Sequence, residues 1–90
     1  MKLKPGFSLQ DVCGEKVLVA QGKENIDFTK LITLNETAAF LYQTAKRLGN
    51  FTIDDLVKAI CQEYEVSATQ AEHDIKELLR QWKQTGLLAD

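Results

Sequence analysis

The sequence predicts an α+β fold in which a three-stranded antiparallel sheet is followed by three helices, in the order βββααα. Before Asn35 there are three runs typical of strands: two in which apolar residues recur at every second position, and one, Val17–Ala20, that is β-branched and apolar. After Asn35, they recur in three runs with the period of an amphipathic helix. Three short strands bury too little surface to be stable alone. Sheet and helices are therefore expected to share one core, in a single domain of residues 1–90.

The first two strands are expected at Phe7–Val12 and Lys16–Ala20. A tight turn at Cys13-Gly14 would join them, because glycine takes a positive φ at low cost. The third strand is expected at Ile26–Leu34, but Lys30 falls on its apolar face. Either the strand contains a bulge near Lys30, or Lys30 lies at an open edge of the sheet.

Each helix is expected to begin at a capping residue. Asn35 can accept a hydrogen bond from the first turn, which predicts a first helix that runs to Leu48. Capping-box patterns at Thr52 and Ser67 predict the other two helices, and the pattern at Ser67 is the closer to the consensus. The third helix is expected to end before Gly86. The second and third helices, with a short link between them, predict a winged helix-turn-helix-like fold.

The sequence offers few groups for catalysis or metal binding. His73 is the single histidine and has no partner at catalytic spacing. Cys13 and Cys61 lack the spacing that zinc sites use. We therefore expect no enzyme activity, no metal and no cofactor, with free thiols in a reducing cytoplasm. No secretory signal is visible, and no apolar run approaches the ~20 residues of a membrane span, so no membrane partner is expected.

The helix-turn-helix pattern makes DNA binding an alternative. Lys76, Arg80 and Lys83 are spaced to form one basic stripe on the third helix. However, the region from Thr52 to Thr85 holds seven acidic and four basic residues, a net charge of −3. Such a region repels phosphate, which argues against nucleic acid as a partner. A generic protein-interaction adaptor is the other alternative.

The third strand suggests a peptide site instead. The edges of a sheet present unpaired N–H and C=O groups, and some proteins use them to receive a peptide as an added strand. The run Phe28–Leu34 contains no proline or glycine that would prevent this. From the pattern alone, the run could also be an interior strand, or an edge covered by the third helix or by a second copy.

At the strand-to-helix junction, Leu34-Asn35-Glu36-Thr37-Ala38-Ala39 resembles the PqqD-like family. These are the small recognition domains and peptide chaperones of ribosomal peptide (RiPP) modification systems, such as PQQ biosynthesis. The resemblance covers nearly the whole chain, including the end of the third helix at Trp-Lys-Gln-Thr-Gly-Leu-Leu. It implies a domain that captures the leader of a precursor peptide by strand addition. It also implies that the domain presents this peptide to a modifying enzyme, often of the radical S-adenosylmethionine class.

The resemblance also implies where the leader binds. Its backbone would pair with the third strand, apolar side chains of that strand and of the third helix would supply pockets, and Lys76 or Arg80 would steer acidic leader residues. The implied peptide-binding residues are Phe28, Thr29, Lys30, Leu31, Ile32, Thr33 and Leu34 on the strand, and Ile75, Lys76, Leu78, Leu79, Arg80 and Trp82 on the helix. The sequence leaves open which of the helix side chains face the cleft and which face the core.

Overall fold

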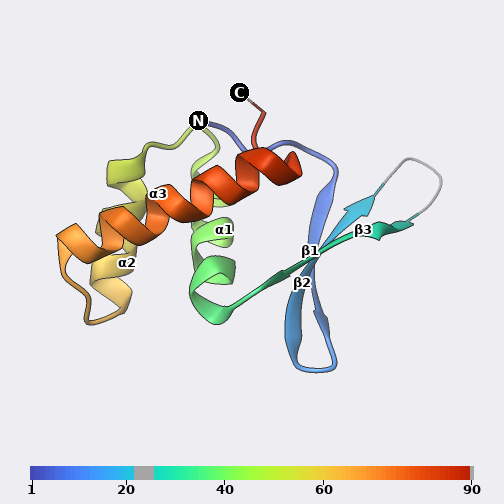
Figure 1. Cartoon of the computed structure of the whole chain (residues 1–90), viewed down its shortest axis with the longest axis horizontal. Coiled ribbons are helices and arrows are strands. Elements are labelled where there is room, and N and C mark those ends of the chain that lie inside the picture. Colours follow the sequence, from blue (N-terminus) through green and yellow to red (C-terminus); the bar gives the residue numbers. More distant parts are fainter. Residues whose placement is uncertain (22–25, 90) are drawn as a thin grey trace.

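The computed structural model describes residues 1–21 and 26–89, and for residues 21 and 26–31 it describes only the course of the backbone. The elements are β1 (Phe7–Val12), β2 (Glu15–Gln21), β3 (Ile26–Leu34), α1 (Glu36–Leu48), α2 (Ile53–Glu63) and α3 (Ala68–Thr85). The predicted α+β fold with the order βββααα is confirmed. The three helices pack together, the sheet extends to one side of them, and β3 runs directly into α1 (Figure 1).

The sheet is antiparallel with the order β1-β2-β3, so β3 is an edge strand. The pairing of β1 with β2 runs from Phe7↔Ala20 to Val12↔Glu15, which leaves Cys13 and Gly14 as a two-residue turn. Both turn residues have positive φ angles, 54° at Cys13 and 84° at Gly14. A type I′ hairpin turn requires positive φ at both positions, so the predicted turn is confirmed.

The pairing of β2 with β3 changes register in the middle of the strands. Leu18 pairs with Ile32, but Ala20 pairs with Asp27. Two steps along β2 thus correspond to five along β3, so β3 carries extra residues between these pairs. The irregularity falls where the sequence predicts a bulge, and β3 is also an open edge of the sheet. The side chain of Lys30 lies outside the described residues.

Capping side chains begin α2 and α3 at the predicted residues. Thr52 makes a complete capping box, because its Oγ1 accepts from Asp55 N at 3.1 Å and Asp55 Oδ2 accepts from Thr52 N at 2.9 Å. Ser67 Oγ accepts from Gln70 N at 3.1 Å. The expected return bond from Gln70 is replaced, since its amide donates to Asp74 Oδ1 one turn further on, at 2.9 Å. The stronger box is therefore at Thr52, and the prediction that favoured Ser67 was wrong.

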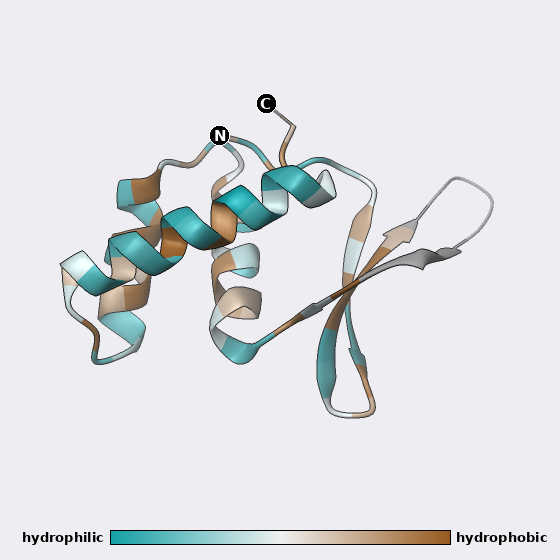
Figure 2. Cartoon of the chain, viewed as in Figure 1, coloured by the Kyte–Doolittle hydropathy of each residue, from teal (hydrophilic) through white to brown (hydrophobic). Residues whose placement is uncertain are grey.

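Sheet and helices share one core, as predicted. Leu18 on β2 and Leu56 on α2 are fully buried, and Ile75 on α3 is only 1% exposed. Trp82 packs edge-on against Tyr42 of α1, with ring centres 5.9 Å apart. The side of α3 that faces the viewer in Figure 2 is mostly hydrophilic, because its apolar side chains turn inward.

The segments before β1 and after α3 are joined by backbone hydrogen bonds. Lys4 N donates to the Leu87 carbonyl at 2.6 Å, and Ala89 N donates to the Lys2 carbonyl at 2.9 Å. Leu87 is fully buried beside them. Both segments are therefore part of the folded unit and lie at the same end of the molecule (Figure 1).

Candidate functional site

A cleft lies between the end of β3 and α3. Its first cavity, here called the strand cavity, has a volume of about 150 Å³. It is lined by Ile32, Thr33, Leu34, Asn35, Ala38, Leu78, Gln81, Trp82 and Thr85. The edge strand β3 and one side of α3 thus form opposite walls of this cavity. An extended peptide that pairs with β3 would lie against this side of the helix.

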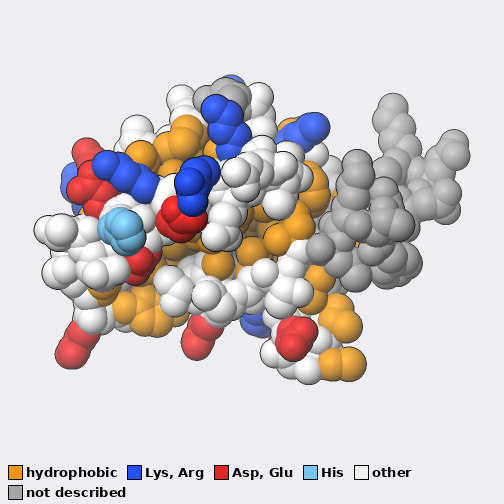
Figure 3. Space-filling view, in the orientation of Figure 1, with side chains coloured by type: hydrophobic (Ala, Val, Ile, Leu, Met, Phe, Trp, Pro, Cys, Tyr) orange, Lys and Arg blue, Asp and Glu red, His pale blue; other side chains and the backbone are white. Residues whose placement is uncertain are grey.

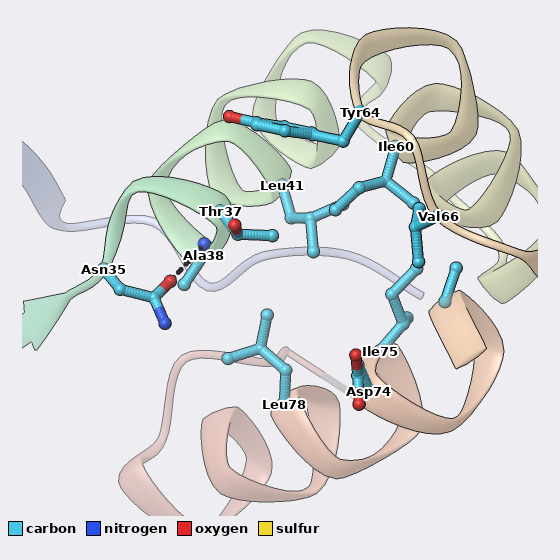
Figure 4. Close-up of a pocket in the computed structure, with 11 residues that line it drawn as sticks. Asn35, Thr37, Ala38, Leu41, Ile60, Tyr64, Val66, Asp74, Ile75 and Leu78 are labelled. Carbon is cyan, nitrogen blue, oxygen red and sulfur yellow. Dashed lines mark hydrogen bonds between the residues drawn. The ribbon is translucent and has the colours of Figure 1, made fainter.

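A second cavity continues beyond the end of β3, between the three helices, with a volume of about 350 Å³. This helix cavity shares Asn35, Ala38 and Leu78 with the strand cavity. Most of its other lining is apolar, with polar groups at a few positions (Figure 4). These other lining residues are Thr37, Leu41, Ile60, Tyr64, Val66, Ala71, Asp74 and Ile75. The two cavities are therefore neighbours along the cleft.

Asn35 stands where the two cavities meet. Its Oδ1 accepts a hydrogen bond from Ala38 N at 2.7 Å, which caps α1. Its own backbone is extended, with φ −72° and ψ 174°, so β3 reaches the helix without a loop. The amide nitrogen of the same side chain points away from the capping bond, towards the side of Leu78 (Figure 4). The predicted cap is confirmed, and it also places a hydrogen-bond donor at the cleft.

Six of the implied peptide-binding residues line the two cavities: Ile32, Thr33, Leu34, Ile75, Leu78 and Trp82. They differ in how far a partner could reach them. Thr33 is exposed, and Ile32 and Leu78 are half-buried, whereas the other three belong to the core. Thr33, Ile32 and Leu78 are therefore the side chains most available to a bound peptide.

Trp82 is the largest side chain in the wall of the strand cavity, and it is 2% exposed. Its buried indole N–H has no hydrogen-bond partner among the described residues. The side chain is therefore held by packing, including its edge-on contact with Tyr42.

Lys76, Leu79 and Arg80 do not lie at the cleft. They line a separate hollow of about 420 Å³ whose other lining residues are Met1, Ile53, Lys83 and Leu88. At about 100° per residue, Lys76 and Arg80 lie nearly opposite Leu78 on α3. Figure 3 shows Lys and Arg side chains along the upper side of the helix and hydrophobic side chains below it, towards the sheet. The steering role implied for these two bases thus has no geometric support at the cleft.

The side chains of Phe28, Thr29, Lys30 and Leu31 lie outside the described residues, so their implied roles stay predictions. Several other lining residues are not among those implied by the sequence. Ile60, Tyr64 and Val66 bring the end of α2 into the helix cavity, and Asp74 adds a carboxylate. Ile60 and Tyr64 fall at helical spacing after Leu56, so the sequence places them on one apolar stripe of their helix. Periodicity cannot show that the stripe extends past the core into an open hollow.

The groups considered for other chemistry are scattered. His73 is exposed on α3, Cys13 is exposed at the hairpin turn, and Cys61 Sγ lies 3.6 Å from the Val66 carbonyl oxygen. Within residues 1–21 and 26–89, no three His, Cys, Asp or Glu side chains are grouped so that they could hold a metal ion. Over the same residues, no helix has both the length and the hydropathy to cross a membrane.

An open sheet edge beside an apolar helical cleft is characteristic of a small winged-helix-like domain with a surface suited to an extended peptide. The chain belongs to the family described as "Coenzyme PQQ synthesis protein D (PqqD)", which matches residues 15–88. A comparison with curated protein sequences gives no match.

Two solved structures have a similar fold. The structure titled "TbiB1 in Complex with the TbiA(beta) Leader Peptide" is 21% identical, with a TM-score of 0.76 over 99% of this chain and 95% of that one. The structure titled "Lasso peptide synthetase B1 complexed with the leader peptide" is 28% identical, with a TM-score of 0.71 over 96% and 93% of the two chains. Both of those structures contain a leader peptide.

Proposed function

We propose that this chain recognises the leader of a ribosomally made precursor peptide, binds it by strand addition and presents it to a modifying enzyme. Membership of the PqqD family and the fold shared with two leader-bound proteins support this function. The observation that carries it is that β3 is an edge strand ending in a cleft formed with α3. In this proposal residues 1–90 act as one non-catalytic domain, and the resemblance suggests a radical S-adenosylmethionine enzyme as the partner.

The edge of β3 suits strand addition because its backbone is already extended and paired on one side. It pairs with β2 on its inner side, and the Asn35 cap holds its end. The protein therefore loses little conformational entropy when a peptide pairs with the outer side. Backbone hydrogen bonds supply affinity that tolerates different sequences, and alternate side chains of the added strand would face the wall of α3.

DNA binding is less well supported. The bases on α3 have acidic neighbours, since Lys76 pairs with Glu72 at 3.0 Å and Arg80 pairs with Glu77. Their charge is thus partly neutralised on a unit that is already acidic overall.

The exposed free thiol of Cys13 fits a reducing compartment, and we propose that the domain acts in the cytoplasm.

A leader titration tests the proposed function. The probe is a synthetic leader taken from a short reading frame beside this gene, added to ¹⁵N-labelled protein. We expect amide shifts at Ile32–Leu34 and along α3 near Leu78 and Trp82, since these residues line the strand cavity. Shifts confined to α2 or to the β1–β2 hairpin would show that the leader binds elsewhere.

A pair of proline variants tests whether the leader pairs with the strand itself. Neighbouring N–H groups of a strand point to opposite edges, so one of Ile32 and Thr33 faces β2 and the other faces outward. Ile32→Pro and Thr33→Pro should therefore differ, one losing the sheet and the other keeping the fold but losing leader binding. Leu9→Pro and Gln10→Pro on β1 provide the control at the opposite edge. A folded β3 variant that binds as tightly as the parent contradicts strand addition.

A further inference from the structure

The two cavities of the cleft carry one charged group. Among the described residues that line them, Asp74 is the single charged side chain. It is exposed, its Oδ1 accepts from Gln70 Nε2 at 2.9 Å, and its Oδ2 is not used in that bond. No described lysine, arginine or histidine forms an ion pair with it. An apolar cavity thus has an uncompensated carboxylate in its lining.

The other charged groups around the helix cavity do not make its net charge positive. Glu36 in the first turn of α1 offsets the positive end of that helix. On α3, Glu77 pairs with Arg80, and Lys76 lies on the opposite side with Glu72. Lys16 lines a neighbouring hollow and pairs with Asp11 at 3.0 Å. A side chain that enters the helix cavity therefore meets apolar walls and a net negative charge.

We propose that the helix cavity receives from the bound peptide one side chain with an apolar stem and a cationic end, an arginine or a lysine, and that Asp74 binds the cation. Long basic side chains bury their methylene stems on apolar surface and keep the charge at a polar rim. A carboxylate is the strongest acceptor for such a group. This charge preference is the reverse of the acidic leader residues that the sequence suggests.

The proposal rests on the proposed function, because a peptide paired with β3 is what brings a side chain to this place. The helix cavity begins where β3 ends, at Asn35 and Leu78. It is therefore reached by residues just beyond the paired segment. The other two strand pairs of the sheet are antiparallel. If the peptide also pairs antiparallel to β3, the peptide residues that reach the helix cavity are on the N-terminal side of its paired segment.

Two matched small molecules test the cavity without any peptide. The probes are 2-phenylethylammonium and 3-phenylpropanoate, which share a phenyl ring and a two-carbon linker and differ in the sign of the end charge. A volume of about 350 Å³ lies within the range of small-molecule sites. In ¹⁵N amide titrations at pH 7 we expect shifts around Leu41, Ile60 and Ile75. The ammonium should bind about three- to fivefold more tightly, as expected for an exposed ion pair.

Asp74→Asn should reduce that preference to less than about twofold, because the variant keeps the shape and removes the charge. Glu77→Gln is the matched control. It removes the next acidic group on α3, which lines neither cavity, and should leave the preference unchanged. Equal binding of the two probes by the parent protein, no binding in the cavity, or an unchanged preference in Asp74→Asn would each overturn the proposal.

The leader titration separates this inference from the proposed function. A leader with a basic residue on the N-terminal side of its paired segment should bind Asp74→Asn about three- to fivefold more weakly, with the β3 shifts retained. If the leader shifts β3 but the probes show no charge preference, the cavity proposal fails and leader recognition stands. If the probes bind with the expected preference but no leader shifts β3, leader recognition fails.

Discussion

Asn35 at the end of β3 and Leu78 on α3 lie across from one another where the strand cavity meets the helix cavity, and each of them lines both (Figure 4). Leu78 is half-buried, so part of its side chain packs on the core and part is left for a ligand. Its neighbour Leu79 is 6% exposed and lines the hollow on the other side of the helix. This difference gives a matched pair of variants.

Leu78→Ala should lower leader affinity about tenfold while costing about 1 kcal/mol of unfolding free energy or less, because it removes contact area at the cleft. Leu79→Ala should cost about 2–5 kcal/mol of unfolding free energy, because it opens a cavity in the core. The folded fraction of Leu79→Ala should bind as before. Urea unfolding and isothermal titration measure the two effects. Equal losses of affinity in both variants would contradict the placement of Leu78 at the cleft.

Asn35→Ala should lower the free energy of unfolding by about 1 kcal/mol, because the N–H of Ala38 loses its cap. It should also weaken leader binding, since the end of β3 is no longer fixed. Ser67 caps α3 but lines neither cavity, so Ser67→Ala should cost similar stability and leave binding unchanged. Chemical denaturation and leader titration of both variants provide the comparison. Loss of binding in Ser67→Ala as well would attribute the effect to general stability.

Cys13→Asn should raise the free energy of unfolding by about 1 kcal/mol. Cys13 has a φ of 54°, a left-handed conformation that asparagine adopts more readily than other residues with a side chain. Cys13→Val should lower stability, because a β-branched side chain is strained there. Thermal unfolding of the three proteins checks the order. Equal melting temperatures for the asparagine and valine variants would contradict the turn geometry.

Leader binding should change the fluorescence of Trp82, the single tryptophan of the chain, because its side chain lines the strand cavity. The emission change should follow the same binding curve as the amide shifts. A scrambled leader of the same composition is the control peptide. A leader that shifts the β3 amides and leaves the emission unchanged would place the peptide away from α3.

Burial raises the pKa of the Tyr42 hydroxyl above its usual value of 10.0. In the unfolded chain this group ionises near pH 10, while in the folded protein it keeps its proton to higher pH. Its contribution to stability is therefore fully present below pH 10 and is lost as the pH rises through the folded pKa. Tyr42→Phe should remove that part of the alkaline loss, as measured by urea unfolding between pH 8 and 11. Identical pH profiles for the two proteins would contradict it.

Local signals predict the fold well. The caps at Asn35, Thr52 and Ser67 involve residues close in sequence, so the helix starts follow from the sequence. The candidate site is harder to predict, because it depends on where β3 lies relative to α3. Leu78 and Leu79 belong to one apolar stripe, and only tertiary packing assigns one to the cleft and the other to the opposite hollow.

The basic residues of α3 show the same limit. Their spacing predicts a single stripe, which the structure bears out, since Lys76, Arg80 and Lys83 line one hollow. The sequence does not reveal that this stripe faces away from β3. The charge preference expected for a bound peptide therefore changes sign once Asp74, and not Lys76, is found at the cleft.

Because β3 passes directly into the Asn35 cap, the protein fixes the distance along a bound precursor peptide between the segment paired with β3 and the residue in the helix cavity. With no loop between strand and helix, the distance from the last strand pairs to the helix cavity is fixed, at about 3.3 Å per residue along an added strand. A slip of one residue would turn every contact side chain to the opposite face, so only slips of two keep the pattern. The domain would then select precursor peptides by the number of residues between the paired segment and the residue in the helix cavity.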